Sequence, residues 1–207
     1  MKKEIYIIRH CGPFVPLVEK EKVTFEEKSK NMILSVEAEK KMEKISKIKE
    51  LENIDMIYSS DSSRAIATAK YVANNNNLPI IIDDRLNERK FGITYIDELP
   101  ENIIVKQFED ENYKLDNGES LKDVINRLEV VLNEILNNNT KRVLISLHGI
   151  GMMCFLKMFC DVKYNGEKFT VKVHEKVIFH EQIKLPEIFK LEFNENKRGV
   201  CIYNVKY

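Results

Sequence analysis

A chain of 207 residues with 43% hydrophobic residues is long enough and apolar enough to form one domain with a sizeable buried core. Its 33 Lys and Arg residues balance 33 Asp and Glu residues, and this net charge of zero argues against nucleic-acid and anionic-membrane partners. No apolar run reaches the roughly 18–20 residues of a membrane span, and the short run after Glu4 is too brief for a secretory signal, so we expect a cytoplasmic protein.

The first elements alternate between short apolar runs and longer segments of helical period, which is typical of an α/β protein. The run from Ile5 to Ile8 predicts a parallel strand that is buried on both faces. Residues 11–32, with one glycine and two prolines, are expected to be irregular. Further elements are predicted as follows: a helix from Ser35 to Leu51, a strand at 54–58, a helix at 61–73 ended by the asparagines 74–77, and a buried strand at 79–82.

The pattern weakens over residues 83–118, where a helix is expected after Pro100. Ser120 to Asp123 resembles a capping box and opens an amphipathic helix that reaches Ile135. The remaining predicted elements are a buried strand at 143–147, an apolar helix at 152–159, a strand at 169–173 and a hairpin of 188–193 with 200–205 around 194–199. We find no linker and predict one domain over residues 1–207.

Charged and polar residues follow the predicted strands where these strands end. Arg9 and His10 follow the first, Arg64 the second, Glu88 the third and His148 the fourth. Because ligands of open α/β sheets bind outside the carboxyl ends of the strands, we expect these five side chains to converge. Guanidinium groups bind phosphate or carboxylate, histidine can act as a nucleophile, and a carboxylic acid can protonate a departing alkoxide. Such a set suits phosphoryl transfer.

These residues also have ordinary structural explanations. A lone arginine such as Arg9 or Arg64 usually forms a surface salt bridge, and Glu88 could be an exposed loop residue. The four histidines of the chain show no spacing typical of metal ligands. We therefore predict neither a metal site nor a cofactor.

Five segments carry a more specific signal because they occur in order and at fitting separations. They are Ile7–Gly12 with its Arg-His pair, residues 58–69 with Ser59, Ser60, Arg64 and Ala65, Leu86–Gly92 around Glu88, Gly118–Ser120 with Asp123 and Arg127, and Ile145–Gly149. Together they resemble the motifs of the histidine phosphatase superfamily, which includes the cofactor-dependent phosphoglycerate mutases. The similarity runs from about residue 4 to residue 160. It implies a phosphoglycerate mutase-like fold, an α/β three-layer sandwich with a mostly parallel central sheet flanked by helices.

The resemblance also implies roles for the five residues. His10 would be the catalytic nucleophile that becomes phosphohistidine, and Arg9, Arg64 and His148 would bind the phosphoryl oxygens around it. Glu88 would protonate the leaving group and then act as the base for water, and His148 would complete the catalytic set. The activity implied is hydrolysis of a small-molecule phosphomonoester.

Three positions depart from the family pattern. Cys11 replaces a usual glycine, which is expected to affect the backbone beside His10, and Leu147 replaces a small residue. Pro16 stands where mutase-like members carry a phosphate-contacting asparagine, and residues 93–101 do not match the mutases' substrate-binding insertions. These differences favour hydrolysis. Phosphoglycerate mutase-type phosphotransfer and a catalytically weak module that binds phosphorylated ligands are the alternatives.

Overall fold

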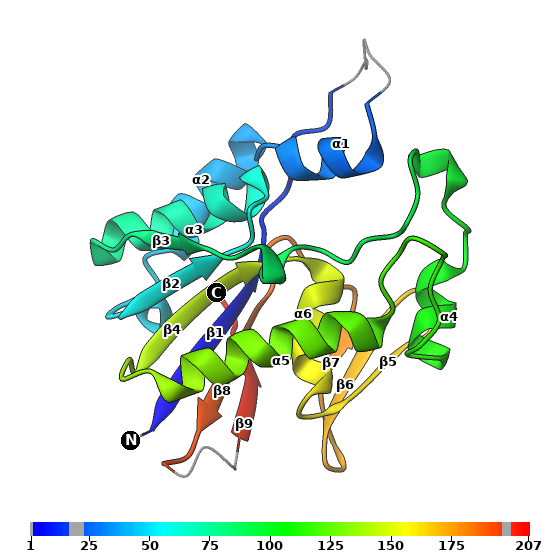
Figure 1. Ribbon diagram of the computed structural model, residues 1–207. Coiled ribbons are helices and arrows are strands. Elements are labelled where there is room, and N and C mark those ends of the chain that lie inside the picture. Colours follow the sequence, from blue (N-terminus) through cyan, green and yellow to red (C-terminus); the bar gives the residue numbers. More distant parts are fainter. Residues whose placement is uncertain (1, 17–22, 196–199) are drawn as a thin grey trace.

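A central sheet of six strands lies between helices in the computed structural model, which describes residues 2–16, 23–195 and 200–207 (Figure 1). In spatial order the strands are β3 (Ile80–Ile82), β2 (Met56–Ser59), β4 (Arg142–Leu147), β1 (Lys3–Arg9), β8 (Ile188–Phe193) and β9 (Val200–Asn204). The first four run parallel, whereas β8 pairs antiparallel with β1 and β9 antiparallel with β8. The predicted mostly parallel sheet and the C-terminal antiparallel pair are confirmed.

Helices cover both faces of this sheet. They are α2 (Val36–Ile45) and α3 (Ser63–Asn76) on one face, and α5 (Leu121–Asn137) and α6 (Gly149–Lys157) on the other. Short 3₁₀ helices occur at Lys49–Leu51, Asp84–Leu86 and Ile96–Glu98. The three layers implied by the family resemblance are therefore confirmed.

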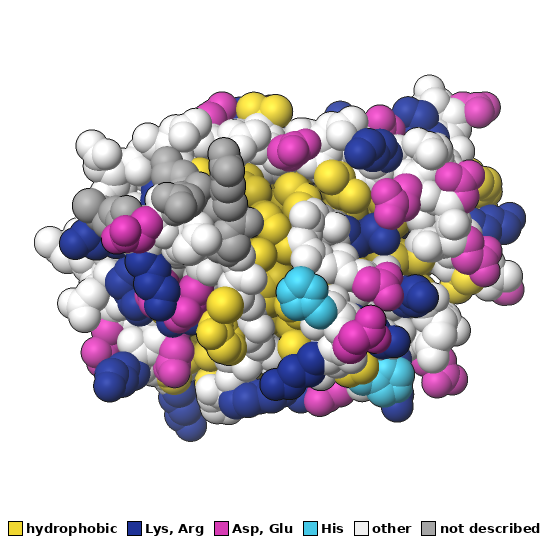
Figure 2. Space-filling model, turned by 90° about the horizontal axis from the view of Figure 1, so that it is seen from below, with side chains coloured by type: hydrophobic (Ala, Val, Ile, Leu, Met, Phe, Trp, Pro, Cys, Tyr) yellow, Lys and Arg dark blue, Asp and Glu magenta, His cyan; other side chains and the backbone are white. Residues whose placement is uncertain are grey.

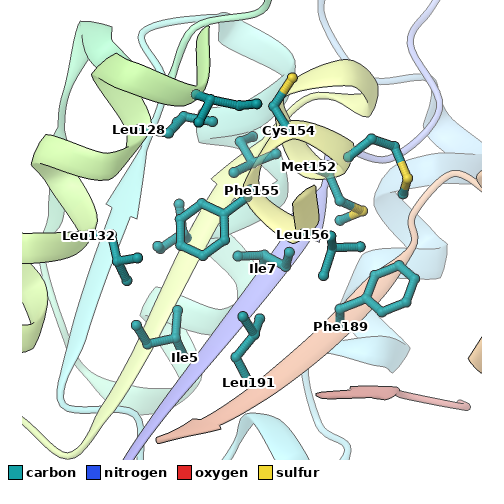
Figure 3. Close-up of a cluster of buried hydrophobic side chains, with 14 of the residues drawn as sticks. Ile5, Ile7, Leu128, Leu132, Met152, Cys154, Phe155, Leu156, Phe189 and Leu191 are labelled. Atoms are coloured by element: carbon teal, nitrogen blue, oxygen red, sulfur yellow. The ribbon is translucent and has the colours of Figure 1, made fainter. Parts of the chain in front are cut away.

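Each face of the sheet has its own hydrophobic core because successive side chains of a strand point to opposite faces. Ile5 and Ile7 of β1 belong to the core that includes α5 and α6, and Tyr6 and Ile8 belong to the core that includes α2 and α3. Figure 3 shows the first core, in which Phe155 of α6 lies among the strand side chains. Each such buried side chain stabilises the fold by about 1.5–3 kcal/mol.

A second, antiparallel sheet packs against the first core. It consists of β5 (Asp161–Tyr164), β6 (Phe169–Val173) and β7 (Lys176–Glu181). Val162, Val171 and Phe179 of this outer sheet are buried in the same cluster as α5 and α6. The helix expected after Pro100 is α4 (Ile103–Glu109), which contacts β5. Only β6 of the outer sheet was predicted as a strand.

One helix lies in a stretch that the sequence predicts to be irregular. This is α1 (Phe25–Asn31), whose capping box joins Thr24 and Glu27. No side chain of α1 is buried, so the segment lacks the apolar stripe that reveals a surface helix in a sequence. In Figure 1, α1 lies above the carboxyl ends of the parallel strands.

Three further predictions need correction. The asparagine run does end α3, through the left-handed Asn77, but the helix continues to Asn76 and does not stop at residue 73. The side chain of Asn76 bonds to the carbonyls of Leu51 and Val72. The strand β3 is not buried: it is the sheet edge, and Ile82 is 48% exposed. The helix expected at 152–159 begins three residues earlier, at Gly149. Part of the expected turn at 194–199 falls outside the described residues.

Within the described ranges, no helix combines the length and the apolar composition of a membrane span. Figure 2 shows the molecule from below, with a band of hydrophobic side chains across the middle of this face. Basic and acidic side chains are interspersed around that band. This face thus displays the even mixture of charges that the composition predicts.

Candidate active site

The two predicted histidines lie against each other at the carboxyl ends of β1 and β4. These strands are parallel neighbours, so the residues that follow them meet at one edge of the sheet. The rings of His10 and His148 lie edge-on, with centroids 5.3 Å apart. Both are buried, and the backbone N–H of His10 donates to the carbonyl of Leu147 at 2.9 Å.

Arg64, in the first turn of α3, reaches the same place. Its Nη2 donates to Nδ1 of His148 at 3.0 Å, and Nε2 of His148 lies 2.8 Å from the hydroxyl of Ser60. A guanidinium can only donate, so Nδ1 of His148 is unprotonated and Nε2 donates to Ser60. The same guanidinium also donates to the carbonyl oxygen and the hydroxyl of Ser29 in α1. The ring of His148 is therefore neutral. The bonds to Ser29 connect the guanidinium of Arg64 to α1.

The imidazole of His10 is fixed in one tautomer. Its Nδ1 lies 2.8 Å from the carbonyl oxygen of Cys11, which can only accept, so Nδ1 carries the proton and Nε2 keeps a lone pair. The N–H of Cys11 donates to the hydroxyl of Thr68 at 2.9 Å, and this hydroxyl donates to the carbonyl of Arg64 at 2.8 Å. The loop that carries His10 is thus attached to the helix that carries Arg64.

Cys11 occupies its position without backbone strain. Its φ angle is not positive, so the conformational freedom of the family's glycine is not required here. The side chain is 1% exposed, and burial raises the pKa of its thiol. Leu147, which precedes His148 and replaces a small residue of the family, is fully buried in the first core.

Arg9, the last residue of β1, contacts Gly149 and the segment that follows β7. Its Nη1 donates to the carbonyl of Ile183, and that of Lys184 lies 3.4 Å away. Its Nε is buried without a hydrogen-bond partner, and a Cβ on Gly149 would come within 3.4 Å of it. Burial lowers the pKa of the guanidinium, and nearby Glu88 opposes this effect. A buried guanidinium with an unpaired N–H favours an anionic ligand.

Glu88 is half-buried at the N-terminus of α6 and is not a free loop residue. Its carboxylate accepts the backbone N–H groups of Ile150 and Gly151, both at 3.1 Å, and that of Arg89 at 2.9 Å. A helix N-terminus favours a negative charge and needs acceptors for its free N–H groups. Burial lowers the pKa of both Arg9 and Arg64, and the charge of Glu88 opposes this effect in each of them, so Glu88 belongs to the same cluster of charges.

Two glycines fix the segment that carries Glu88. Gly92 has a φ of +80°, and a Cβ on it would lie 2.4 Å from the backbone nitrogen of Gly118. The adjacent Glu119 donates its N–H to the carbonyl of Lys90 at 2.8 Å and accepts the N–H of Lys90 on its carboxylate. The segments 86–92 and 118–120 therefore meet backbone to backbone, which explains why both need glycine.

Burial lowers the pKa of both histidines well below their ordinary value of 6.5. For His10 the neighbouring His148 and Arg64 lower the pKa further, and for His148 the charges of Arg64, Arg127 and Arg9 do so. Both rings are therefore neutral at neutral pH, as their hydrogen bonds also require.

We expect the free energy of unfolding to decrease as the pH falls from about 7 to about 5. The histidines protonate near pH 6.5 in the unfolded chain but stay neutral in the native state. The unfolded state then binds more protons, so acid favours it, by at most about 1.4 kcal/mol per histidine and pH unit. Urea denaturation across this range measures the effect. The slope should be smaller in His148→Gln, and a stability that does not change with pH in the unaltered protein would contradict the prediction.

The structure brings together all five residues that the sequence assigns to the site, and it adds others. Ser29 accepts a hydrogen bond from Arg64, and Ser60 bonds to His148. Thr68 accepts the backbone N–H of Cys11. Ser60 and Thr68 lie inside the motif at 58–69, whereas nothing in the sequence marks Ser29. Across residues 2–16, 23–195 and 200–207, no three His, Cys, Asp or Glu side chains form a group that could hold a metal ion.

A family model described as histidine phosphatase superfamily (branch 1) matches residues 5–180. The match covers most of the chain and includes every residue of the cluster. The chain belongs to the histidine phosphatase superfamily. The resemblance carried by the five motifs is thereby confirmed.

Individual relatives of this histidine phosphatase superfamily member agree with that result. Phosphoserine phosphatase 1 of Hydrogenobacter thermophilus is 32% identical over 118 residues, which are 53% of this chain and 54% of that protein. The chain thus matches about half the length of this curated relative.

Solved structures of low sequence identity show the same fold. A mycobacterial glucosyl-3-phosphoglycerate phosphatase matches with a TM-score of 0.71 at 15% identity over the full length of both chains. YhfR of Bacillus stearothermophilus matches with a TM-score of 0.70 at 21% identity, over 99% of this chain and 98% of that one. Phosphoglycerate mutase of Bacillus anthracis matches with a TM-score of 0.64 at 15% identity, over 99% and 92%. The phosphoglycerate mutase-like fold is confirmed.

Proposed function

We propose that the protein hydrolyses phosphomonoesters through a phosphohistidine formed on His10. The observation that carries this proposal is the tautomer of His10, whose Nδ1–H is bonded to the carbonyl of Cys11 while Nε2 keeps its lone pair among buried arginines. A neutral imidazole oriented in this way is a nucleophile, and the adjacent positive charges attract a phosphate group. That the curated relative is named a phosphatase supports hydrolysis as the reaction.

The reaction proceeds in two displacements. In the first, Nε2 of His10 attacks phosphorus, the N–P bond forms as the P–O bond to the alcohol breaks, and protonated Glu88 gives its proton to the departing oxygen. In the second, Glu88 takes a proton from water, the water oxygen attacks phosphorus, the N–P bond breaks and inorganic phosphate leaves. The carboxyl group of Glu88 lies at the start of α6 beside Arg9 and Arg64, so the same group can serve the departing oxygen and then the attacking water.

Charge stabilisation comes from Arg9, Arg64 and His148. Both guanidinium groups remain charged at neutral pH and bind phosphoryl oxygens through paired N–H groups. A dianion beside His148 favours the protonated ring, which lets Nδ1 donate to a phosphoryl oxygen instead of accepting from Arg64. His148 then serves as a catalytic residue that binds the transferred group.

Covalent labelling tests the proposal. We expect 4-nitrophenyl phosphate with a radiolabelled phosphate group to leave an acid-labile and alkali-stable label on His10 while inorganic phosphate is released. His180→Asn, a change at an exposed histidine of β7, should keep the label. Phosphate release with no acid-labile label at any time after mixing would contradict the mechanism. Tight phosphate binding without release would favour the binding module, and stimulation by a bisphosphorylated primer would favour the mutase reaction.

A further inference from the structure

A cavity of about 360 Å³ opens beside the candidate active site. Its lining includes Arg9, Glu88 and Gly149 from the site, and residues of β5, of β6 and of the segment that follows β7. Its volume lies within the range of pockets that hold small organic ligands. Glu88 also lines a smaller cavity of about 210 Å³ beside α1, whose walls include Lys30 and Lys90. We assign the alcohol to the cavity of about 360 Å³ because only this one of the two is lined by both Glu88 and Arg9.

The walls of the cavity are mainly apolar. Phe91 and Ile104 come from the segment between β3 and α5, Ile150 from α6, and Tyr164 and Phe169 from the outer sheet. Tyr164 and Phe169 stack with their ring centroids 4.4 Å apart. The hydroxyl of Tyr164 donates to the carbonyl of Gly166, so its polar group is already occupied. Such walls gain free energy by removing an apolar group from water.

The charges around the cavity disfavour a second phosphate. Arg9 is committed to the transferred phosphoryl group, and Arg89 is 2% exposed, with Nη1 bonded to Gln107 and its guanidinium 4.1 Å from the Phe91 ring. The Nε and Nη2 atoms of Arg89 also lack a hydrogen-bond partner, but they are buried and the guanidinium is covered by the Phe91 ring, so an anion in the cavity cannot reach them as it can reach Arg9. The other charged residues of the wall, Glu88 and Glu167, are carboxylates that repel an anion. None of the described residues in the wall therefore offers a second accessible cation.

We propose that this cavity, which we name the leaving-group pocket, selects phosphate monoesters whose alcohol part is apolar, aromatic or branched aliphatic, and carries no second phosphate. This inference rests on the proposed hydrolysis at His10. The outer sheet is then the element that determines which alcohol is accepted.

Two esters of primary alcohols test the proposal because their leaving groups differ in polarity more than in reactivity. We expect kcat/KM for benzyl phosphate to exceed that for glycerol 1-phosphate by about 10- to 200-fold, as for other apolar pockets. 2,3-Bisphosphoglycerate should be the poorest of the three. A preference for glycerol 1-phosphate or for the bisphosphate would overturn the proposal.

Variants of the pocket connect this preference to its walls. Ile104→Trp fills the pocket and should lower kcat/KM for benzyl phosphate about 10-fold or more, with little change for glycerol 1-phosphate. Tyr164→Ser removes part of the outer wall and should also reduce the ratio of the two values. Ile96→Trp, a matched change at a 55% exposed residue outside the pocket, should leave the ratio unchanged.

Failure of the pocket and failure of the proposed function give different results. Hydrolysis of both esters with an unchanged ratio in Ile104→Trp and Tyr164→Ser overturns the pocket alone. The absence of hydrolysis of every ester by the unaltered protein overturns the proposed function. Activity on glycerol 1-phosphate shows in each variant that the protein has folded.

Discussion

Replacement of His10 by asparagine is expected to lower turnover of any phosphomonoester by on the order of 10⁴-fold or more. The asparagine amide can still donate to the carbonyl of Cys11, as Nδ1 of His10 does, but it offers no nucleophilic nitrogen. Release of inorganic phosphate under single-turnover conditions measures the loss. The acid-labile label should disappear with it.

The same variant should retain its affinity for inorganic phosphate, because Arg9, Arg64 and His148 are unchanged. Isothermal titration with phosphate and thermal unfolding check that the site and the fold persist. His180→Asn on β7 is the matched control and should keep full turnover. Turnover of His10→Asn near that of the unaltered protein would exclude the nucleophile assigned here.

Glu88→Gln is expected to lower turnover by about 10²- to 10⁴-fold for alkyl esters such as benzyl phosphate. The glutamine oxygen can still accept the N–H groups of Gly151 and Arg89, which share one carboxylate oxygen of Glu88. Its amide nitrogen can neither accept the N–H of Ile150 nor supply the proton that an alkoxide needs. 4-Nitrophenolate leaves without protonation, so 4-nitrophenyl phosphate should lose much less, about 10-fold or under, in formation of the phosphohistidine. Rapid-quench measurement of this first step with both esters gives the comparison.

A matched control for this variant is Glu98→Gln, which alters an exposed carboxylate of the same segment that accepts the N–H of Thr94. It should leave both rates unchanged. Equal losses for the two esters in Glu88→Gln would show that the residue supports the structure of α6 and is not the general acid.

Sequence periodicity predicted the elements whose burial is regular. The helix α5 shows a full apolar stripe behind its capping box, and the buried stretches Ile5–Ile8 of β1 and 143–147 of β4 are apolar except for Ser146. Elements without such a signal were missed or misjudged. The helix α1 buries no side chain, β5 has a single buried residue, Val162, and the isoleucines of β3 look like a buried strand although this strand lies at the sheet edge.

The convergence of Arg9, His10, Arg64, Glu88 and His148 could be predicted because parallel strands end at one edge of the sheet. Their finer geometry could not, because it depends on contacts between distant segments. The bond from Arg64 to Ser29 crosses from α3 to α1, and the cavity beside Glu88 exists only because the outer sheet folds back next to Arg9. The hydrogen bonds from His10 to the carbonyl of Cys11 and from Arg64 to His148, which set the histidine tautomers, likewise have no counterpart in periodicity or composition.

The carbonyl of Ile183, which holds the guanidinium of Arg9, lies in the segment that leaves β7. A mutation that reshapes the outer sheet to admit a new alcohol therefore also moves a support of the phosphate-binding arginine. A change in the range of accepted alcohols is therefore expected to change the affinity for inorganic phosphate, the product that inhibits by binding at Arg9. Directed evolution toward new esters should accordingly yield variants whose tolerance of accumulated phosphate has shifted together with their choice of substrate.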